Sequence, residues 1–453
     1  MKIRHIAATA LIATVGAGVL QSANAQSDER LPWGALKSGN KDGTIPAWDG
    51  GLPATTSPAG FKKDSGFWAD PYAADKPLYS ITAKNMEQHA DKLSEATKEL
   101  LKRYPTFRVD VYPSRRPANY TASFVENSAK NASGRCKTIE NGEGVSGCFG
   151  GTPFATPKTG HEAMWNLILS HRGASSWTYG QAWYVDGNGN KVMTAEVNNR
   201  NQNDYFSKTL TLEQFYAKGG QYLMNNNSYT APARIVGEGN LQRKYINPVA
   251  LPDKTWSYTP GQRRTRLSPD AAYDFPVATA AGAMLYDEIY GFSGKLDRFD
   301  WKLAGTKELL IPYNAYKYLS AKPDDLLLKG HPNPDVMRWE LHRVTVVDAT
   351  LKPGARHVVA KRRFYFDEDI PSAVVADAWD ATGKLSRGTL NPGVWAYDKQ
   401  VALMGGTNYF DFGTGAWYNS SIMGGYKGMF IEIDDVDSDA FFSAEGLARR
   451  TQR

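Results

Sequence analysis

Two short motifs have the spacing of known chemical sites, and each lacks a necessary part. The run Gly142–Gly147 (GEGVSG) has the glycine spacing of a dinucleotide-binding loop. That loop needs a buried strand before it and a helix after it to direct backbone N–H groups at phosphates, whereas this run lies between two cysteines. His161 and Glu162 begin a zinc-protease motif, but Trp165 stands where the second histidine ligand is needed. The spacing therefore predicts neither a nucleotide site nor a zinc site.

Acidic residues near the end of the chain form a partial match to a calcium-binding loop. Asp435, Asp437 and Asp439 occupy its first three ligand positions, but Ala440 replaces the required glycine and Gly446 the bidentate glutamate. We interpret this stretch as a solvated acidic turn. No complete ligand set is found, so we expect the protein to use no metal and no cofactor.

Other carboxylates could supply an acid and base pair of the kind that glycosidases use. The candidates are Asp287, Glu288, Asp367, Glu368 and Asp369. Neighbouring residues on a strand point to opposite faces, and no nucleophile elbow accompanies them. We therefore expect no catalytic residue. An exported hydrolase that acts on lipid or polysaccharide through Asp367 or Glu368 is the alternative.

Arginines gathered at two places could hold an anion. Arg263, Arg264 and Arg266 lie in one run, and Arg362 and Arg363 follow a lysine in another. One interpretation is the solvated face of exposed strands. The other is a rim that binds the carboxylate or phosphate of a ligand head group, for which the forked guanidinium is suited. This head-group hypothesis assigns the role to Arg263, Arg264, Arg266, Arg362 and Arg363.

The strands that must position such groups carry bulky residues at alternate positions. Phe299 and Trp301 alternate with polar residues, and the same pattern recurs around Trp256 and Trp339. One face of each strand is therefore apolar and the other wet. A sheet of this kind either packs on a second layer or curls round helices and a cavity. The residues predicted to face such a cavity are Trp256, Tyr258, Phe299, Trp301, Leu303, Trp339, Leu341, Phe364 and Phe366.

Strands outnumber helices in the predicted fold. Beyond residue 181 the apolar period is two, and we expect strands at 182–185, 192–197, 234–238, 255–259, 263–267, 299–303, 307–313, 336–351, 356–367, 372–380 and 409–418. Short links with turn-forming residues join many of them, which predicts antiparallel neighbours. We expect helices at 82–103, 161–171 and 212–224. The predicted fold class is α+β and mostly antiparallel β: a large curved incomplete barrel wrapped around a few helices, with an irregular N-terminal extension.

The start of the chain has the layout of a secretory signal. Lys2 and Arg4 precede an apolar stretch that ends in small residues, so we expect cleavage after Ala25 and a periplasmic mature protein. In an oxidising compartment Cys136 and Cys148 are expected to form a disulfide. The chain has 453 residues, 42% hydrophobic, and a net charge of +6. This composition is that of an ordinary globular protein and gives no indication of nucleic-acid binding.

Four long stretches of the sequence are particular enough to carry a resemblance. They are residues 38–48 (SGNKDGTIPAW), 263–276 (RRTRLSPDAAYDFP), 296–316 (LDRFDWKLAGTKELLIPYNAY) and 339–369 (WELHRVTVVDATLKPGARHVVAKRRFYFDED). Through them the chain, from about residue 31 to about residue 426, resembles a bacterial exported family catalogued as domain of unknown function 1329. That family is similar to outer-membrane lipoprotein-sorting proteins. The resemblance implies a lipoprotein-carrier-like fold, a curved antiparallel barrel whose apolar hollow is plugged by helices.

The resemblance also implies partners and a function. Members of the family are commonly encoded beside inner-membrane transporters of the resistance-nodulation-division type and an outer-membrane protein. The implied cargo is a hydrophobic small molecule or lipid that moves between the two membranes, and no catalytic residue is established for the family. We therefore expect a non-catalytic periplasmic carrier or binding protein for a hydrophobic ligand. A structural adaptor of an envelope transport complex is a further alternative, which a cavity filled by side chains would favour.

These patterns divide the chain into four parts. We expect a signal peptide at 1–25 and an N-terminal extension with one amphipathic helix at 26–110. A curved carrier-like sheet domain is expected at 111–430 and a C-terminal tail at 431–453. The sheet domain is expected to hold the ligand.

Overall fold

The computed structural model describes residues 29–269, 272–432 and 439–451. The predicted signal peptide and its cleavage site lie outside the described residues, as do Asp435 and Asp437 of the acidic turn. The predicted disulfide between Cys136 and Cys148 is present. It closes the loop that contains the short strands β3 (Lys137–Ile139) and β4 (Gly144–Ser146). The glycine run singled out above therefore forms part of a small disulfide-closed hairpin.

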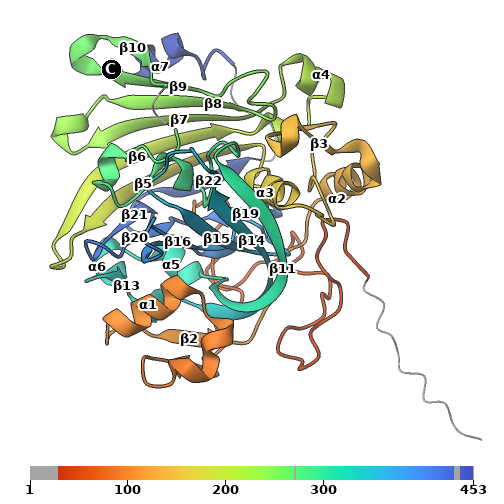
Figure 1. Ribbon diagram of the computed structural model, residues 1–453, viewed down its shortest axis with the longest axis vertical. Coiled ribbons are helices and arrows are strands. Elements are labelled where there is room, and N and C mark those ends of the chain that lie inside the picture. Colours follow the sequence, from red (N-terminus) through yellow and green to blue (C-terminus); the bar gives the residue numbers. More distant parts are fainter. Residues whose placement is uncertain (1–28, 270–271, 433–438, 452–453) are drawn as a thin grey trace, which may run out of the picture.

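One large sheet dominates the described chain (Figure 1). Its strands follow the order β1 (Tyr79–Ile81), β2 (Val109–Tyr112), β14 (Trp339–Leu351), β15 (Lys361–Asp367), β16 (Val374–Trp379), β17 (Leu385–Asn391), β20 (Asn408–Asp411), β21 (Ala416–Ile422), β5 (Ser175–Val185), β6 (Lys191–Gln202), β7 (Gln221–Ala231), β8 (Gly239–Tyr245), β9 (Lys254–Thr259) and β10 (Arg264–Leu267). Two further strands, β11 (Phe299–Pro312) and β22 (Gly428–Glu432), pair with β14 and β5. Among the described strands of this sheet, neighbours are antiparallel except β2 and β14. The sheet is curved and unclosed, which confirms the predicted fold class.

Helices are few and short. They are α1 (Glu95–Arg103), α2 (Ala122–Lys130), α3 (Gly160–Ile168), α4 (Leu212–Ala217), α5 (Tyr316–Ser320), α6 (Pro323–Leu326) and α7 (Ala444–Thr451). Side-chain oxygens of Ser94, Thr121, Thr159 and Thr211 accept hydrogen bonds from backbone N–H groups in the first turns of α1 to α4, as residues of this type do at helix N-termini. Within the described ranges, no helix combines the length and the apolar character that crossing a bilayer requires.

Several predicted elements have different boundaries in the structure. The helix expected at 82–103 divides into a 3₁₀ turn (Met86–Lys92) and α1, because Ser94 begins a new helix. The helix expected at 212–224 ends at Ala217, since Gly219 and Gly220 adopt positive φ and turn the chain into β7. The strand expected at 234–238 is a 3₁₀ turn between β7 and β8.

Other predicted strands merge or divide. The strands expected at 299–303 and 307–313 form the single strand β11, with an irregularity in register at Gly305. The strand expected at 409–418 is two strands, β20 and β21, joined by a tight turn. Short pairs complete the fold: β12 (Leu327–Leu328) with β13 (His331–Pro332), and β18 (Gly393–Ala396) with β19 (Val401–Met404).

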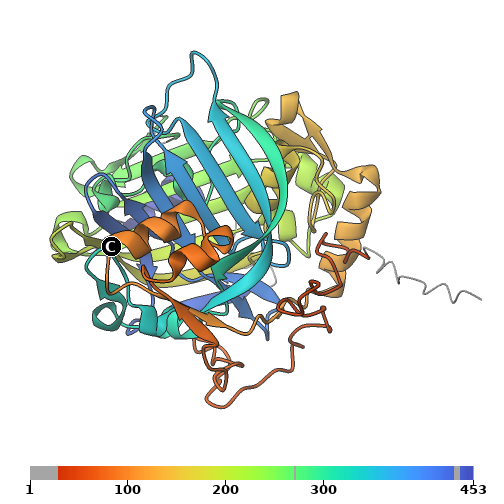
Figure 2. The same cartoon turned by 60° about the horizontal axis from the view of Figure 1, so that its bottom comes forward.

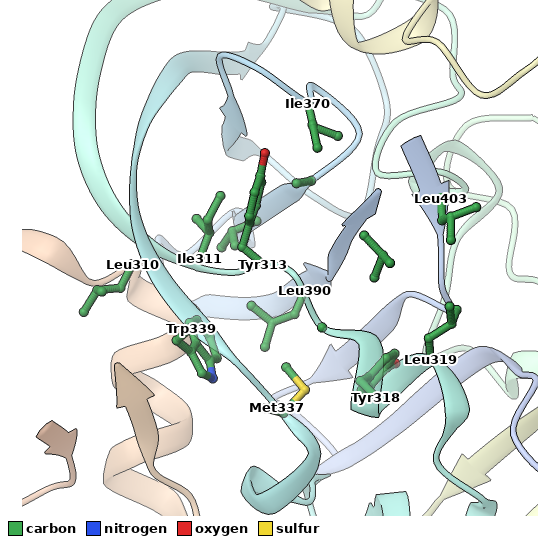
Figure 3. Close-up of a cluster of buried hydrophobic side chains, with 14 of the residues drawn as sticks. Leu310, Ile311, Tyr313, Tyr318, Leu319, Met337, Trp339, Ile370, Leu390 and Leu403 are labelled. Atoms are coloured by element: carbon green, nitrogen blue, oxygen red, sulfur yellow. The ribbon is translucent and has the colours of Figure 1, made fainter. Parts of the chain in front are cut away.

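The half of the sheet around β14–β17 is packed on both faces. On β15, Phe364 and Phe366 belong to a core that includes residues of α3, whereas Tyr365 between them belongs to a core that includes residues of α1. Figure 2 shows α1 lying across the strands of this half. Figure 3 shows part of the core that includes residues of α1, with Trp339, Met337, Leu390 and Leu319 of α5 among its buried side chains. Side chains fill the space on both sides of these strands.

Buried ion pairs fasten the N-terminal segment, residues 29–120, to this half of the sheet. The Arg116 guanidinium contacts the Asp369 carboxylate at 2.6 and 3.0 Å, and both side chains are buried. Trp33 Nε1 also donates to Asp369 (3.3 Å), and the Leu36 N–H donates to Glu368 (3.2 Å). The segment therefore lies on the sheet through specific polar contacts as well as through its aromatic residues.

Replacing Asp369 tests this attachment. Asp369→Asn removes the two charge-assisted hydrogen bonds of the buried Arg116 guanidinium and leaves it with Glu368 at 3.6 Å, so the free energy of unfolding should fall by about 2 kcal/mol. Urea denaturation followed by tryptophan fluorescence measures the change. The matched control is Glu126→Gln in the exposed pair Lys130–Glu126, which should leave the midpoint unchanged. Equal midpoints for Asp369→Asn and wild type would contradict the assignment.

Candidate functional site

A cavity of about 390 Å³ lies on the other half of the sheet. Strands β5–β9 form one wall, the segment 277–290 covers part of it, and residues between 402 and 429 line a further side. The volume falls in the range of roughly 300–1,000 Å³ that is usual for small-molecule sites. Empty space therefore exists in the curve of this sheet. Of the strands whose aromatic residues were predicted to surround it, β9 borders the space, whereas β11, β14 and β15 do not.

Four asparagines form a closed ring on the cavity wall. In this asparagine ring, Asn199 Nδ2 donates to Asn227 Oδ1 (2.6 Å) and Asn227 Nδ2 to Asn225 Oδ1 (3.0 Å). Asn225 Nδ2 donates to Asn201 Oδ1 (2.6 Å), and Asn201 Nδ2 returns to Asn199 Oδ1 (2.7 Å). The ring arises because Asn199 faces Asn227, and Asn201 faces Asn225, in the register of β6 and β7.

Neighbouring polar groups use the second N–H of several ring amides. Asn201 donates to Ser176 Oγ (3.2 Å), Asn225 to the Tyr290 hydroxyl (3.1 Å) and Asn227 to Asn240 Oδ1 (2.8 Å). Ser176, Asn240 and Tyr290 also line the cavity. Because buried polar groups are stable only when they are hydrogen-bonded, this network gives a rigid amide surface that is largely satisfied by the protein itself.

The opposite end of the cavity is apolar except for Arg234, an exposed residue whose Nη2 donates to the Thr194 carbonyl (3.3 Å). Ala182 on β5 and Ala195 on β6 face each other directly and are both buried. With them, the apolar residues that line this end include Ile235, Val277, Met284 and Ile289. The small side chains of the alanine pair leave room that larger residues would fill. The cavity thus has an amide end and an aliphatic end.

The aromatic residues of β9 face away from the amide wall. Ser257, between Trp256 and Tyr258, lines the cavity and pairs with Asn240 across the strands. Trp256 and the Tyr258 ring instead pack in the cluster of the outer face, which includes Leu241 and residues of α7. Tyr258 lines the cavity, as expected. Trp256 does not, because it packs on the outer face of β9 against the cluster that includes residues of α7.

The other residues predicted to line a cavity pack into filled cores. The rings of Trp301 and Phe364 lie 6.0 Å apart, and Phe292 reaches Trp301 at 5.1 Å. None of the following residues lines the cavity of the described chain: Trp256, Phe299, Trp301, Leu303, Trp339, Leu341, Phe364 and Phe366. Helix α3 and the N-terminal segment occupy the space that was expected to be empty.

The predicted head-group arginines do not reach the cavity. Arg362 is buried and makes two hydrogen bonds with Asp287, at 2.8 and 3.0 Å. Arg363 binds both oxygens of Asp348 on the neighbouring strand, at 2.6 and 2.8 Å. Arg263, Arg264 and Arg266 are exposed around the edge strand β10. Two of the predicted head-group residues are thus neutralised within the fold, and the other three lie on its surface.

The predicted carboxylates are also engaged elsewhere. Glu288 pairs with Arg387 at 2.7 Å, and Asp367 lies 3.1 Å from His342. Among the residues lining the cavity Glu238 is the one carboxylate, and histidine is absent. Within the described ranges, no group of three or more His, Cys, Asp or Glu residues could hold a metal ion. The cavity therefore presents amides, hydroxyls, two arginines and aliphatic groups, a set suited to binding.

Sequence reasoning missed the asparagine ring and Arg172. The ring has a readable signal, since Asn199 and Asn201, and likewise Asn225 and Asn227, recur at period two in strand-like segments. No sequence pattern marks Arg172, because it follows helix α3 as a single basic residue. The fold places it beside the cavity.

The sequence as a whole has relatives. Residues 80–448 match the family described as protein of unknown function (DUF1329). The chain belongs to this family. An uncharacterized protein of Pseudomonas aeruginosa is 39% identical over 399 residues, which cover 85% of this chain and 84% of that protein. The resemblance inferred from the four stretches is thereby confirmed.

Solved structures similar to this DUF1329 member include two from other bacteria. A DUF1329 family protein from Desulfovibrio piger has 13% identity and a TM-score of 0.43, and covers 64% of this chain and 97% of that one. A LolA superfamily protein from Nitrosomonas europaea has 9% identity and a TM-score of 0.37, and covers 64% of this chain and 100% of that one.

His342 gives this DUF1329 member a testable pH dependence. Its ring lies 3.1 Å from Glu340 and 3.1 Å from Asp367. Despite its burial, these two carboxylates raise its pKa to about 9. A histidine whose pKa is raised by folding makes its full contribution to stability when the pH is below its pKa in the unfolded chain, about 6.5. This contribution is lost as the pH rises towards 9.

The free energy of unfolding should therefore fall between pH 7.5 and 9, by at most about 1.4 kcal/mol per pH unit. His342→Gln should lower the stability at pH 7.5 and flatten the slope, whereas His89→Gln, at a partly exposed position, should leave the slope as in wild type. Urea titrations at several pH values measure this dependence of the free energy of unfolding on pH. A wild-type slope retained in His342→Gln would refute the assignment.

Proposed function

We propose that this protein is a non-catalytic carrier or binding protein for a hydrophobic or amphipathic ligand, a lipid or another hydrocarbon, which it takes up in the cavity beside β5–β9. The observation that carries the proposal is the cavity itself, about 390 Å³ of space with an aliphatic end. Burial of apolar surface supplies the driving force. At ~0.8 kcal/mol per buried CH₂, even six methylenes contribute about 5 kcal/mol before ordering costs.

The composition of the wall supports binding in preference to hydrolysis. A hydrolase of the glycosidase type needs two carboxylates on either side of the reacting bond, and Glu238 is the single carboxylate among the lining residues. Asp367 and Glu368, the residues of the alternative hypothesis, are instead held in ion pairs with His342 and Arg343 outside the cavity. The open space likewise speaks against an adaptor with a filled core.

We further propose that the protein acts in the periplasm. The secretory layout of residues 1–25 and the disulfide between Cys136 and Cys148 support export to an oxidising compartment. A bound hydrocarbon does not return readily to water. Release therefore calls for membrane partners, which we propose are a transporter of the resistance-nodulation-division type in the inner membrane and an outer-membrane protein.

Filling the aliphatic end tests the cavity as the binding site. Ala195→Phe places a ring where the alanine pair leaves room, so the affinity for the neutral probe N-phenyl-1-naphthylamine should fall by about tenfold or more. The matched control is Val192→Phe on the same strand, where the side chain is 50% exposed. Fluorescence titration of the purified full chain measures both.

Wild-type affinity in Ala195→Phe would exclude this cavity as the site. If overpacking unfolds that variant, Ala195→Leu adds less volume and should weaken the probe in the same direction. Native mass spectrometry of protein purified from the periplasm should show a co-purified hydrocarbon in wild type and less of it in either cavity variant. Wild-type protein that is consistently empty would count against the carrier function.

A further inference from the structure

The cavity wall changes from polar to apolar along a single strand. On β6 the lining residues, taken from the end of the strand backwards, are Asn201, Asn199, Val197 and Ala195. The six steps from Ala195 to Asn201 span roughly 20 Å at about 3.3 Å each. A ligand that lies along β6 therefore meets amides at one end and aliphatic side chains at the other.

A cation stands at the amide end. Arg172 precedes β5 and lines the cavity, with its guanidinium carbon 4.9 Å from the centre of the Tyr290 ring. Its Nε donates to Ser170 Oγ (3.3 Å) and its Nη2 to the Ile168 carbonyl (3.1 Å). Within the described parts of the chain, its Nη1 makes no hydrogen bond and its side chain makes no ion pair. One edge of the guanidinium is therefore free to face the cavity.

The electrostatics of this end favour an incoming anion. Burial lowers the pKa of Arg172, because a charge removed from water without a counter-ion is unfavourable. A second cation, Lys244, is buried nearby, and burial together with repulsion from Arg172 lowers its pKa as well. Asp253 accompanies Lys244 at 3.9 Å, whereas Arg172 has no carboxylate partner among the described residues. The other lining arginine, Arg234, is exposed to solvent and lies at the far end of the cavity, beside Thr194. An anionic ligand would supply that partner.

We propose that the cavity binds an amphipathic anion, with a carboxylate or phosphate head group at Arg172 and its apolar part along β6 towards Ala195. The forked guanidinium fits either head group, and the asparagine ring beside it offers amide contacts to the adjoining polar atoms. This inference rests on the proposed carrier function and names the class of its ligand. It assigns the head-group role to a residue other than the clustered arginines.

Ligand preference tests the inference. Dodecanoate, dodecyl phosphate and dodecanol share one apolar chain and differ in the head group, and each is titrated against N-phenyl-1-naphthylamine bound to the purified full chain. Wild type should bind at least one of the two anions about tenfold more tightly than dodecanol, because charge-assisted hydrogen bonds are the stronger ones. Comparison of the two anions distinguishes a carboxylate from a phosphate site. Arg172→Met should abolish the preference and keep the affinity for dodecanol.

The controls separate this inference from the carrier function. Arg264→Met removes the same charge from the exposed strand β10 and should keep the wild-type preference. Equal binding of all three compounds by wild type, or an unchanged preference in Arg172→Met, would overturn the anion site and leave the carrier function standing. A wild-type protein that binds none of them would overturn both. Circular dichroism checks folding, and Arg172→Gln is measured if Arg172→Met does not fold.

Discussion

The desolvation of amide groups is the constraint on which the arrangement of β5–β9 depends. An asparagine that leaves water must find partners for two N–H groups and a carbonyl oxygen. Asn199, Asn201, Asn225 and Asn227 meet much of this demand among themselves because cross-strand register places them side by side. Met224 on β7 and Leu241 on β8, which alternate with lining residues of those strands, face outward and pack in a cluster with residues of α7. The polar cavity wall and the packed outer face both follow from the alternation of side chains between the two faces of these strands.

The two halves of the sheet differ in what covers their faces. Around β14–β17, α3 on one side and α1 with the N-terminal segment on the other bring side chains into contact with both faces. Over β5–β9 the inner cover is the segment 277–290, which has no long helix and carries small and medium residues such as Ala278 and Met284. A helix fills a concave sheet with regularly spaced side chains, whereas an irregular segment of this kind leaves a gap. The cavity therefore lies where the cover is a loop.

The sequence predicts the strands well and the site poorly, for a physical reason. Period-two alternation locates β9, β14 and β16 closely, because it reports directly which residues share a face. It does not report which face is inside, and on β9 the aromatic face of Trp256 turned out to meet a helix from the end of the chain. Large apolar residues show where cores are packed, so they are a poor guide to empty space. The small pair Ala182 and Ala195 and the repeated asparagines were the more informative signal.

Clustered arginines in the sequence are likewise a poor guide to which arginine is free to bind a ligand. Arg363 lies in a basic run, yet its cross-strand neighbour in the register of β14 and β15 is Asp348, which binds it with two oxygens. Basic clusters on strands readily acquire such partners, since an acidic residue at the facing position is enough. Arg172, single in the sequence, lies where the neighbouring elements bring rings, amides and another cation. The charge best placed to bind a ligand is the one that the fold leaves without a counter-ion, and finding it requires the pairing of strands as well as the residues themselves.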